Sequence, residues 1–182
     1  MKLILKERLI SWFDSFNVYD EDGNIYFKVK GKLAWGHKLV IYNAAGSEIG
    51  MVREKIVDIL PQFNLFKDGE KVGTITKKLT VIRPKFKIDF NGWDIDGNWL
   101  EWDYSIRDKK GHRVAAIYKK LLRLTDTYVI EVENEADALD ALMVVLAIDA
   151  EKCSEEKKEE KKDEKKDEKK RKAEAKAVKM GK

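Results

Sequence analysis

The chain has 182 residues, which suits one domain with an appendage, and its single cysteine, Cys153, excludes an internal disulfide framework. Its formal net charge of +4 lies wholly in residues 151–182, which hold 14 Lys and Arg against 10 Asp and Glu, whereas residues 1–150 hold 23 of each sign. A neutral body excludes a nucleic-acid footprint on the folded domain, so nucleic acid is expected at most as a weak partner of the tail.

The first residues of the chain predict a protein of the cytoplasm. Lys6, Glu7 and Arg8 interrupt the apolar residues near the N-terminus, so the sequence shows no secretory signal. A lone cysteine also favours a reducing compartment. We therefore expect a cytoplasmic protein, with a peripheral place at the membrane as the alternative.

Residues 5–130 predict a run of β-hairpins through an internal repeat. Gly23, Gly46 and Gly69 follow one another at intervals of 23 residues, and glycine accepts the positive φ that a tight reversal requires. Between the turns, each copy carries alternating apolar residues, which are typical of half-buried strands. Two strands in each of about six copies give roughly a dozen strands, which favours a barrel or a sandwich over a solenoid.

Two acidic segments, 20–24 and 94–98, are predicted to be hairpin turns rather than calcium loops. Both read Asp-x-Asp-Gly-Asn. An EF-hand loop needs glycine at its sixth position and a bidentate Glu at its twelfth. Here glycine is fourth, and the twelfth residues are Gly31 and Ser105. We expect no metal site and no cofactor.

The apolar stretch after Asn134 predicts one buried helix over residues 136–150, which Asn134 can cap. Residues 138–148 are apolar on every face apart from Asp140, so the helix must be surrounded by protein or by lipid. A bilayer span needs about 20 apolar residues, and Asp140 and Asp149 bracket only eight. The sequence therefore predicts a helix in the core of a β-rich domain rather than a membrane span.

Residues 151–182 predict a charged tail without a stable fold. The Glu-Glu-Lys-Lys period of four places like charges four residues apart, which mildly destabilises a helix. We expect a solvated, disordered segment in which helix fluctuates. Its polybasic stretch 169–172 can contact a membrane or nucleic acid, or simply keep the chain soluble.

Taken together, several of these segments resemble the LURP-one-related family, whose members share the tubby C-terminal-like fold. The resemblance extends over residues 3–150 and rests on segments 20–24, 30–33, 97–99, 126–130 and 142–149. It implies one closed antiparallel β-barrel of about twelve strands around a hydrophobic C-terminal helix, in a domain over residues 1–150. Phospholipid scramblases are more distant relatives, and tubby proteins bind phosphoinositides on this fold, but a fold does not carry function with it.

Basic residues of the repeat are the leading candidates for a binding site. Three copies of the repeat carry two basic residues that are two positions apart, so both side chains share one face of a strand. Two later copies have a single lysine at the equivalent position. If the copies follow one another round a barrel, they form a cationic band that attracts phosphorylated head groups. The alternative is that these lysines keep exposed strand faces soluble. The candidates are Lys6, Arg8, Lys30, Lys32, Arg53, Lys55, Lys78 and Lys120.

No catalytic residues are predicted. An enzyme would require a pocket that places His37 or His112 against a carboxylate, and Cys153 lies at the junction with the tail, a poor place for a nucleophile. The five tryptophans are predicted to pack in the core or at the rims rather than to stack nucleobases.

The sequence favours a non-enzymatic interaction or ligand-binding module, with a protein partner or an anionic lipid head group as its ligand. The alternative is a peripheral binder of anionic phospholipid or phosphoinositide through the basic strand positions and the basic tail. The oligomeric state stays open.

Overall fold

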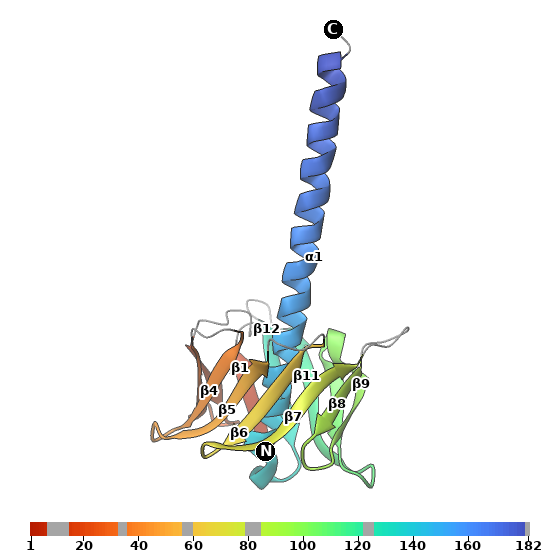
Figure 1. Cartoon of the computed structure of the whole chain (residues 1–182). Coiled ribbons are helices and arrows are strands. Elements are labelled where there is room, and N and C mark those ends of the chain that lie inside the picture. The colour runs from red at the N-terminus through yellow and green to blue at the C-terminus, as the bar shows by residue number, and fades with distance from the viewer. Residues whose placement is uncertain (7–14, 33–35, 56–59, 79–84, 122–125, 181–182) are drawn as a thin grey trace. The chain divides into compact units, whose positions relative to one another are not determined.

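Twelve antiparallel strands form one sheet that curls into a nearly closed barrel (Figure 1). The computed structural model describes residues 1–6, 15–32, 36–55, 60–78, 85–121 and 126–180. The strands are β1 (Lys2–Lys6), β2 (Ser15–Tyr19), β3 (Ile25–Gly31), β4 (Lys38–Asn43), β5 (Glu48–Lys55), β6 (Gln62–Lys67), β7 (Glu70–Lys78), β8 (Lys85–Asp89), β9 (Asp94–Asn98), β10 (Asp103–Arg107), β11 (Arg113–Leu121) and β12 (Asp126–Val132). The predicted mainly β barrel is confirmed.

Every strand pairs with its neighbours in the chain except at one place. β1 also pairs with β12, with Leu3 opposite Ile130, so the first and last strands of the chain lie side by side in the sheet. β8 and β9 stand at the two ends of the hydrogen-bonded order, and no ladder joins their described residues. The barrel therefore has one seam, between β8 and β9.

Hairpins at one end of the barrel are closed by hydrogen bonds to an Asp or Asn side chain. Between β2 and β3, Oδ1 of Asp20 accepts hydrogen bonds from the backbone N–H groups of Asp22 (3.0 Å) and Asn24 (2.8 Å). In segments 43–47 and 108–112, the side chains of Asn43 and Asp108 likewise accept hydrogen bonds from backbone N–H groups of the turn. The first acidic segment is thus a hairpin turn, as predicted.

The second acidic segment is a strand, and the predicted turn there is wrong. Asp94–Asn98 forms β9 and pairs with β10. Gly97 has a φ of 119°, and a Cβ built on it would lie 2.7 Å from the carbonyl oxygen of Asp103. Glycine is needed here for the close approach of β10 rather than for reversal. The chain reverses further on, around the 3-10 helix η1 (Trp99–Glu101).

Helix α1 (Ala138–Met180) follows a short 3-10 helix, η2 (Glu135–Asp137). Oδ1 of Asn134 accepts a hydrogen bond from the N–H of Ala136 (3.1 Å), so Asn134 caps this end as predicted. No helix in the described part of the chain is both long and apolar enough to cross a membrane.

The first turns of α1 fill the barrel. Within residues 138–150, every residue except the half-buried Leu139 is buried. A Cβ on Gly50 of β5 would lie 3.1 Å from Cδ1 of Leu139 and 3.5 Å from Sδ of Met143. The strand wall and the helix are therefore in direct contact, and the predicted core helix is confirmed.

Residues 151–182 form a second unit, in which the structure differs from the predicted disordered tail. Here α1 continues to Met180. Lys, Glu and Ala are good helix formers, and opposite charges three residues apart interact, as Nζ of Lys166 and Oδ1 of Asp163 do at 3.5 Å. Because extending a helix costs less than nucleating one, the segment stays helical in spite of its like charges four residues apart.

Candidate functional site

The predicted basic residues gather at one rim of the barrel. In a sheet whose antiparallel strands follow chain order, alternate strands end at the same rim. The candidates lie at or just after the ends of five such strands, β1, β3, β5, β7 and β11. Those with described side chains are all exposed, namely Lys30, Lys32, Arg53, Lys55, Lys78 and Lys120. Lys6 ends β1, and Arg8 lies outside the described residues.

Three further lysines, which the sequence reasoning missed, stand at the same rim because the returning strands start there. Lys38 begins β4 directly opposite Arg53, and Lys85 begins β8 directly opposite Lys78. Lys87 follows on β8. In a hairpin, a strand begins opposite the end of the strand before it, so lysines at strand starts could have been expected at this rim. Which residues stand opposite one another is known only from the strand register.

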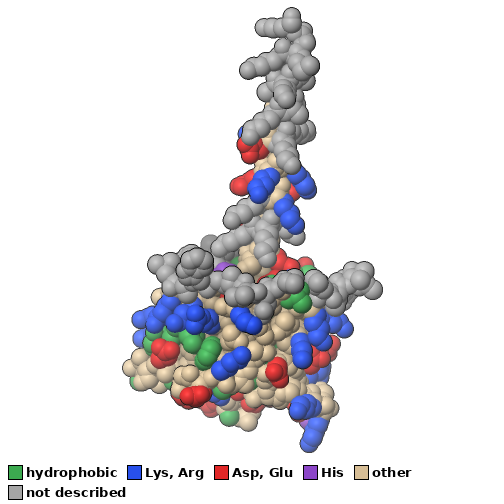
Figure 2. Space-filling view, in the orientation of Figure 1, with side chains coloured by type: hydrophobic (Ala, Val, Ile, Leu, Met, Phe, Trp, Pro, Cys, Tyr) green, Lys and Arg blue, Asp and Glu red, His purple; other side chains and the backbone are tan. Residues whose placement is uncertain are grey.

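We name the outward-facing basic residues of β3 to β8 at this rim the cationic band. In Figure 2, blue side chains gather along the part of the barrel wall next to the grey segments. The cationic band comprises Lys30, Lys32, Lys38, Arg53, Lys55, Lys78, Lys85 and Lys87.

Like charges stand directly opposite each other twice in the cationic band, in the pairs Lys38–Arg53 and Lys78–Lys85. Such pairs destabilise a sheet. No ion pair to another described residue relieves either of them. A bound anion would relieve this repulsion.

Among the described residues of β3 to β8 at this rim, Glu54 is the one carboxylate, and it is held by a histidine. Strand alternation turns Glu54 away from its neighbours Arg53 and Lys55. Its Oε2 accepts a hydrogen bond from the backbone N–H of His37 at 3.0 Å and lies 2.7 Å from Nδ1 of the same residue. The outward face at this rim therefore keeps its positive charge.

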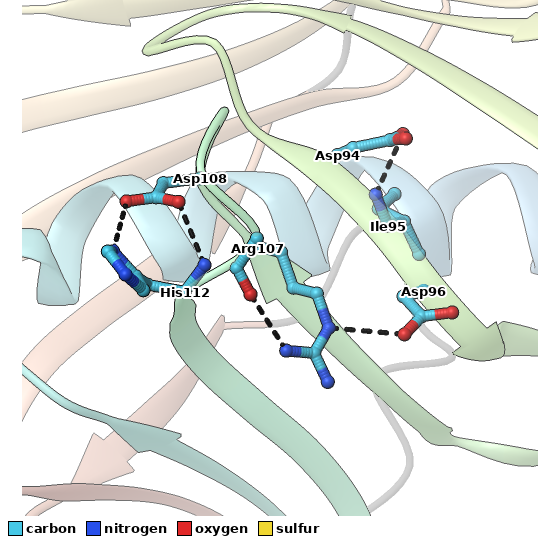
Figure 3. Close-up of polar contacts among 7 residues, drawn as sticks. Asp94, Ile95, Asp96, Arg107, Asp108 and His112 are labelled. Carbon is cyan, nitrogen blue, oxygen red and sulfur yellow. Dashed lines mark hydrogen bonds and ion pairs between the residues drawn. The ribbon is translucent and has the colours of Figure 1, made fainter.

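The second histidine also lies beside a carboxylate, at the opposite rim (Figure 3). Nδ1 of the exposed His112 is 3.2 Å from Oδ2 of Asp108. Desolvation raises the pKa of Asp108, but hydrogen bonds from the backbone N–H groups of His112 and Lys110, together with the His112 side chain, hold that pKa below its usual value. The pair thus closes a turn.

Asp20 shows the same balance in its turn. Desolvation raises its pKa, and hydrogen bonds from Asn24, Asp22 and Gly23 lower it more, so the pKa lies below the ordinary value. The Asp side chains at this rim are part of the hairpin structure.

Three tryptophans are packed in the barrel. Trp93, Trp99 and Trp102 are each at most 7% exposed, which confirms the predicted core packing for these three. Trp12 and Trp35 lie outside the described residues. Exposed aromatic platforms for nucleobases are therefore absent among the described tryptophans.

Comparison with known proteins finds sequence relatives that match the part of the chain that forms the barrel. The profile of the LURP-one-related family matches residues 1–149. The uncharacterized protein YxjI of Bacillus subtilis (strain 168) is 29% identical over 150 residues, which cover 82% of this chain and 92% of that protein. The family match ends where the charged segment begins.

Proposed function

The chain belongs to the LURP-one-related family, and we propose that it is a non-enzymatic binding module whose cationic band docks on anionic phospholipid surfaces. One observation carries this proposal. Eight basic residues converge at one rim, and the described outward-facing residues between them include no Asp or Glu. A basic residue near an anionic membrane contributes about 1 kcal/mol, so the residues that face the surface together give useful affinity.

A lipid surface suits this band better than nucleic acid does. Single-stranded nucleic acid is usually held by exposed aromatic side chains as well as by charge, and the described tryptophans are buried. The cationic band extends from β3 to β8, with residues at five of these strands, as fits a broad surface of like charge. Docking would leave the barrel outside the bilayer.

Vesicle co-sedimentation tests the proposal with the full chain. We expect binding to vesicles that contain phosphatidylglycerol, loss of binding at high salt, and none to phosphatidylcholine alone. The variant Arg53→Gln/Lys78→Gln/Lys85→Gln should bind roughly a hundredfold more weakly, at about 1 kcal/mol for each charge.

Two control variants make the test specific. Lys71→Gln/Lys109→Gln/Lys110→Gln removes the same charge from exposed positions at the other rim and should bind within about twofold of the unmodified chain. An equal loss in both triple variants would overturn docking through the band. So would loss of binding when only the basic residues 169–172 are changed to Gln, because the tail would then be the contact. Absence of salt-sensitive binding by the unmodified chain would overturn the proposal altogether.

A further inference from the structure

The seam is joined by a turn that normally connects paired strands. Asn91 and Gly92 have φ of 50° and 66°, and the N–H of Trp93 donates to the carbonyl oxygen of Phe90 at 3.1 Å. Positive φ at both central residues defines the two-residue turn of a tight β-hairpin. Yet the described residues of β8 and β9 form no ladder, so two strand edges stand side by side without being paired.

Both strands pack closely on their outer neighbours at a glycine. A Cβ on Gly73 of β7 would lie 2.4 Å from the carbonyl oxygen of Asp89 at the end of β8. A Cβ on Gly97 of β9 would lie 2.7 Å from the carbonyl oxygen of Asp103 at the start of β10. The turn itself is fixed, since Nδ2 of Asn91 donates to Oδ2 of Asp140 at 2.8 Å. Glycine at both contacts lets each strand lean away from the seam.

A cavity of about 390 Å³ lies in the seam, which is within the size range of small-molecule sites. Phe86, Ile95 and Trp99 give it an apolar floor, and the rings of Phe86 and Trp99 meet edge to face with centroids 5.0 Å apart. Its remaining lining residues are Lys85, Asp94, Asp96 and Gly97.

Charges of opposite sign line the two sides of this cavity. Asp94 and Asp96 come from β9, and Lys85 comes from β8. Strand alternation places all three outward, above the apolar floor. No ion pair joins Lys85 to either carboxylate in the described structure.

Neighbouring groups hold both carboxylates in place (Figure 3). Oδ2 of Asp96 accepts a hydrogen bond from Nε of Arg107 at 3.1 Å, and Nη1 of Arg107 in turn donates to the carbonyl oxygen of Gly111 at 3.0 Å. Oδ1 of Asp94 accepts from the N–H of Ile95 at 2.9 Å. Each carboxylate still has oxygen lone pairs for a ligand.

We propose that the seam cavity binds an aminoalkyl phosphate, a small zwitterion with a primary ammonium and a phosphate. The ammonium lies against Asp94 and Asp96, and the short carbon chain lies over the apolar floor. The phosphate lies against Lys85 at the β8 side of the cavity, and Lys78, which is outside the lining, adds its charge from β7 directly opposite Lys85. Two opposed lysines suit a free phosphate monoester better than a carboxylate because its dianion offsets both charges, whereas the phosphodiester of a lipid head group carries one negative charge.

This site deepens the proposed function, because Lys78 and Lys85 belong to the cationic band and an aminoalkyl phosphate is the head group of some phospholipids. The same chemistry occurs in free phosphoethanolamine. The experiment therefore uses soluble ligands first and vesicles second.

Calorimetric titration of the full chain with O-phosphoethanolamine tests the site. Inorganic phosphate, which has no ammonium, and phosphocholine, whose ammonium has no N–H donor, should each bind about tenfold more weakly. Asp94→Asn/Asp96→Asn should weaken phosphoethanolamine binding by about tenfold or more. The control Asp22→Asn/Asp68→Asn removes the same charge from two turns outside the seam and should change binding by less than about twofold.

Three results would overturn the site: equal binding of phosphoethanolamine and phosphate, binding that ignores Asp94→Asn/Asp96→Asn, or no binding of any soluble ligand. Phosphatidylglycerol has no ammonium, so its vesicles report on the band alone. Binding to those vesicles without binding of phosphoethanolamine would remove the seam site and leave the proposed function standing. If phosphoethanolamine binds, added affinity for vesicles with phosphatidylethanolamine assigns the lipid as the source, and its absence assigns the free zwitterion.

Discussion

The two segments of helix α1 share one backbone conformation for opposite reasons. Residues 138–150 are almost wholly buried and apolar, whereas the described side chains between residues 160 and 171 are charged and exposed. The first segment is helical because the barrel interior must be filled by a chain that satisfies its own backbone hydrogen bonds. The second is helical through the propensity of Lys, Glu and Ala. We therefore predict that the barrel depends on the buried first segment and not on the exposed residues 160–171, and four changes test this.

Replacing Leu142 or Leu146 with Glu should have the largest effect and unfold the barrel. Both side chains are at most 1% exposed, and an unpaired buried carboxylate costs several kcal/mol out of a total stability of about 5–15 kcal/mol. Loss of the cooperative thermal transition in circular dichroism would show this. Leu142→Met, which conserves volume, should retain the transition. A folded Leu142→Glu protein that merely left membranes would contradict the core assignment and favour a lipid-inserted segment, as in a scramblase-like protein.

Removing the carboxylate of Asp140 should have the next largest effect. Its oxygens lie 2.8 Å from Nζ of Lys67 and accept a hydrogen bond from Nδ2 of Asn91 at 2.8 Å. Asp140→Ala removes the buried carboxylate that both groups contact. Because Asn91 is exposed and the Lys67 side chain is 33% exposed, water can replace part of these contacts, and we expect a loss of about 2 kcal/mol in urea unfolding. Asp89→Ala, at an exposed site, should change stability by less than about 0.5 kcal/mol. Equal losses would mean that the contact to Asp140 does not anchor the helix.

Replacing Asp137 should change the stability of the barrel by a smaller amount that depends on pH. Burial and repulsion by Asp140 raise its pKa above the ordinary 3.8, although Lys67 opposes this. A raised pKa in the folded state means that ionisation costs stability once the pH rises above that of the unfolded carboxyl. Asp137→Asn should therefore stabilise the barrel at pH near 7, and the gain should vanish in acid below the unfolded pKa. In an Asp140→Asn background the gain should shrink, because the repulsion is gone. A gain that persists in acid would contradict this origin.

Much of the fold could be predicted from local signals. The turn at 20–24 and the helix after Asn134 depend on neighbouring residues, and both were predicted. Asp96-Gly97 carries the same local signal as a turn, yet it lies in β9 because Gly97 is required by the close approach of β10. Such a contact lies outside any local window of sequence.

The candidate sites were predicted only in part for the same reason. Period-two spacing identified Arg53, and the equivalent position in a later repeat identified Lys78. Lys38 and Lys85 become their partners only once the register is fixed. The turn at Asn91 and Gly92 did have a local signal, because Asn-Gly favours a tight hairpin turn and Gly92 follows Gly69 at the same interval of 23 residues. The seam depends on packing at Gly73 and Gly97, which no single strand reveals.

A substitution in the charged segment should have the smallest effect on barrel stability, and it tests most directly whether the two segments of α1 differ in their contribution. Glu164 is exposed within α1, and Glu164→Pro removes a backbone donor and places a ring against the preceding turn, at a local cost of about 3 kcal/mol. If this segment is helical only through propensity, helical ellipticity should fall while the unfolding midpoint of the barrel stays that of the unmodified chain. Glu164→Ala, which keeps a good helix former, should alter neither. A midpoint lowered as far as in Asp140→Ala would show that the charged segment supports the barrel after all. Barrel stability would then have to be assigned to both segments of α1, and burial alone would not explain where it comes from.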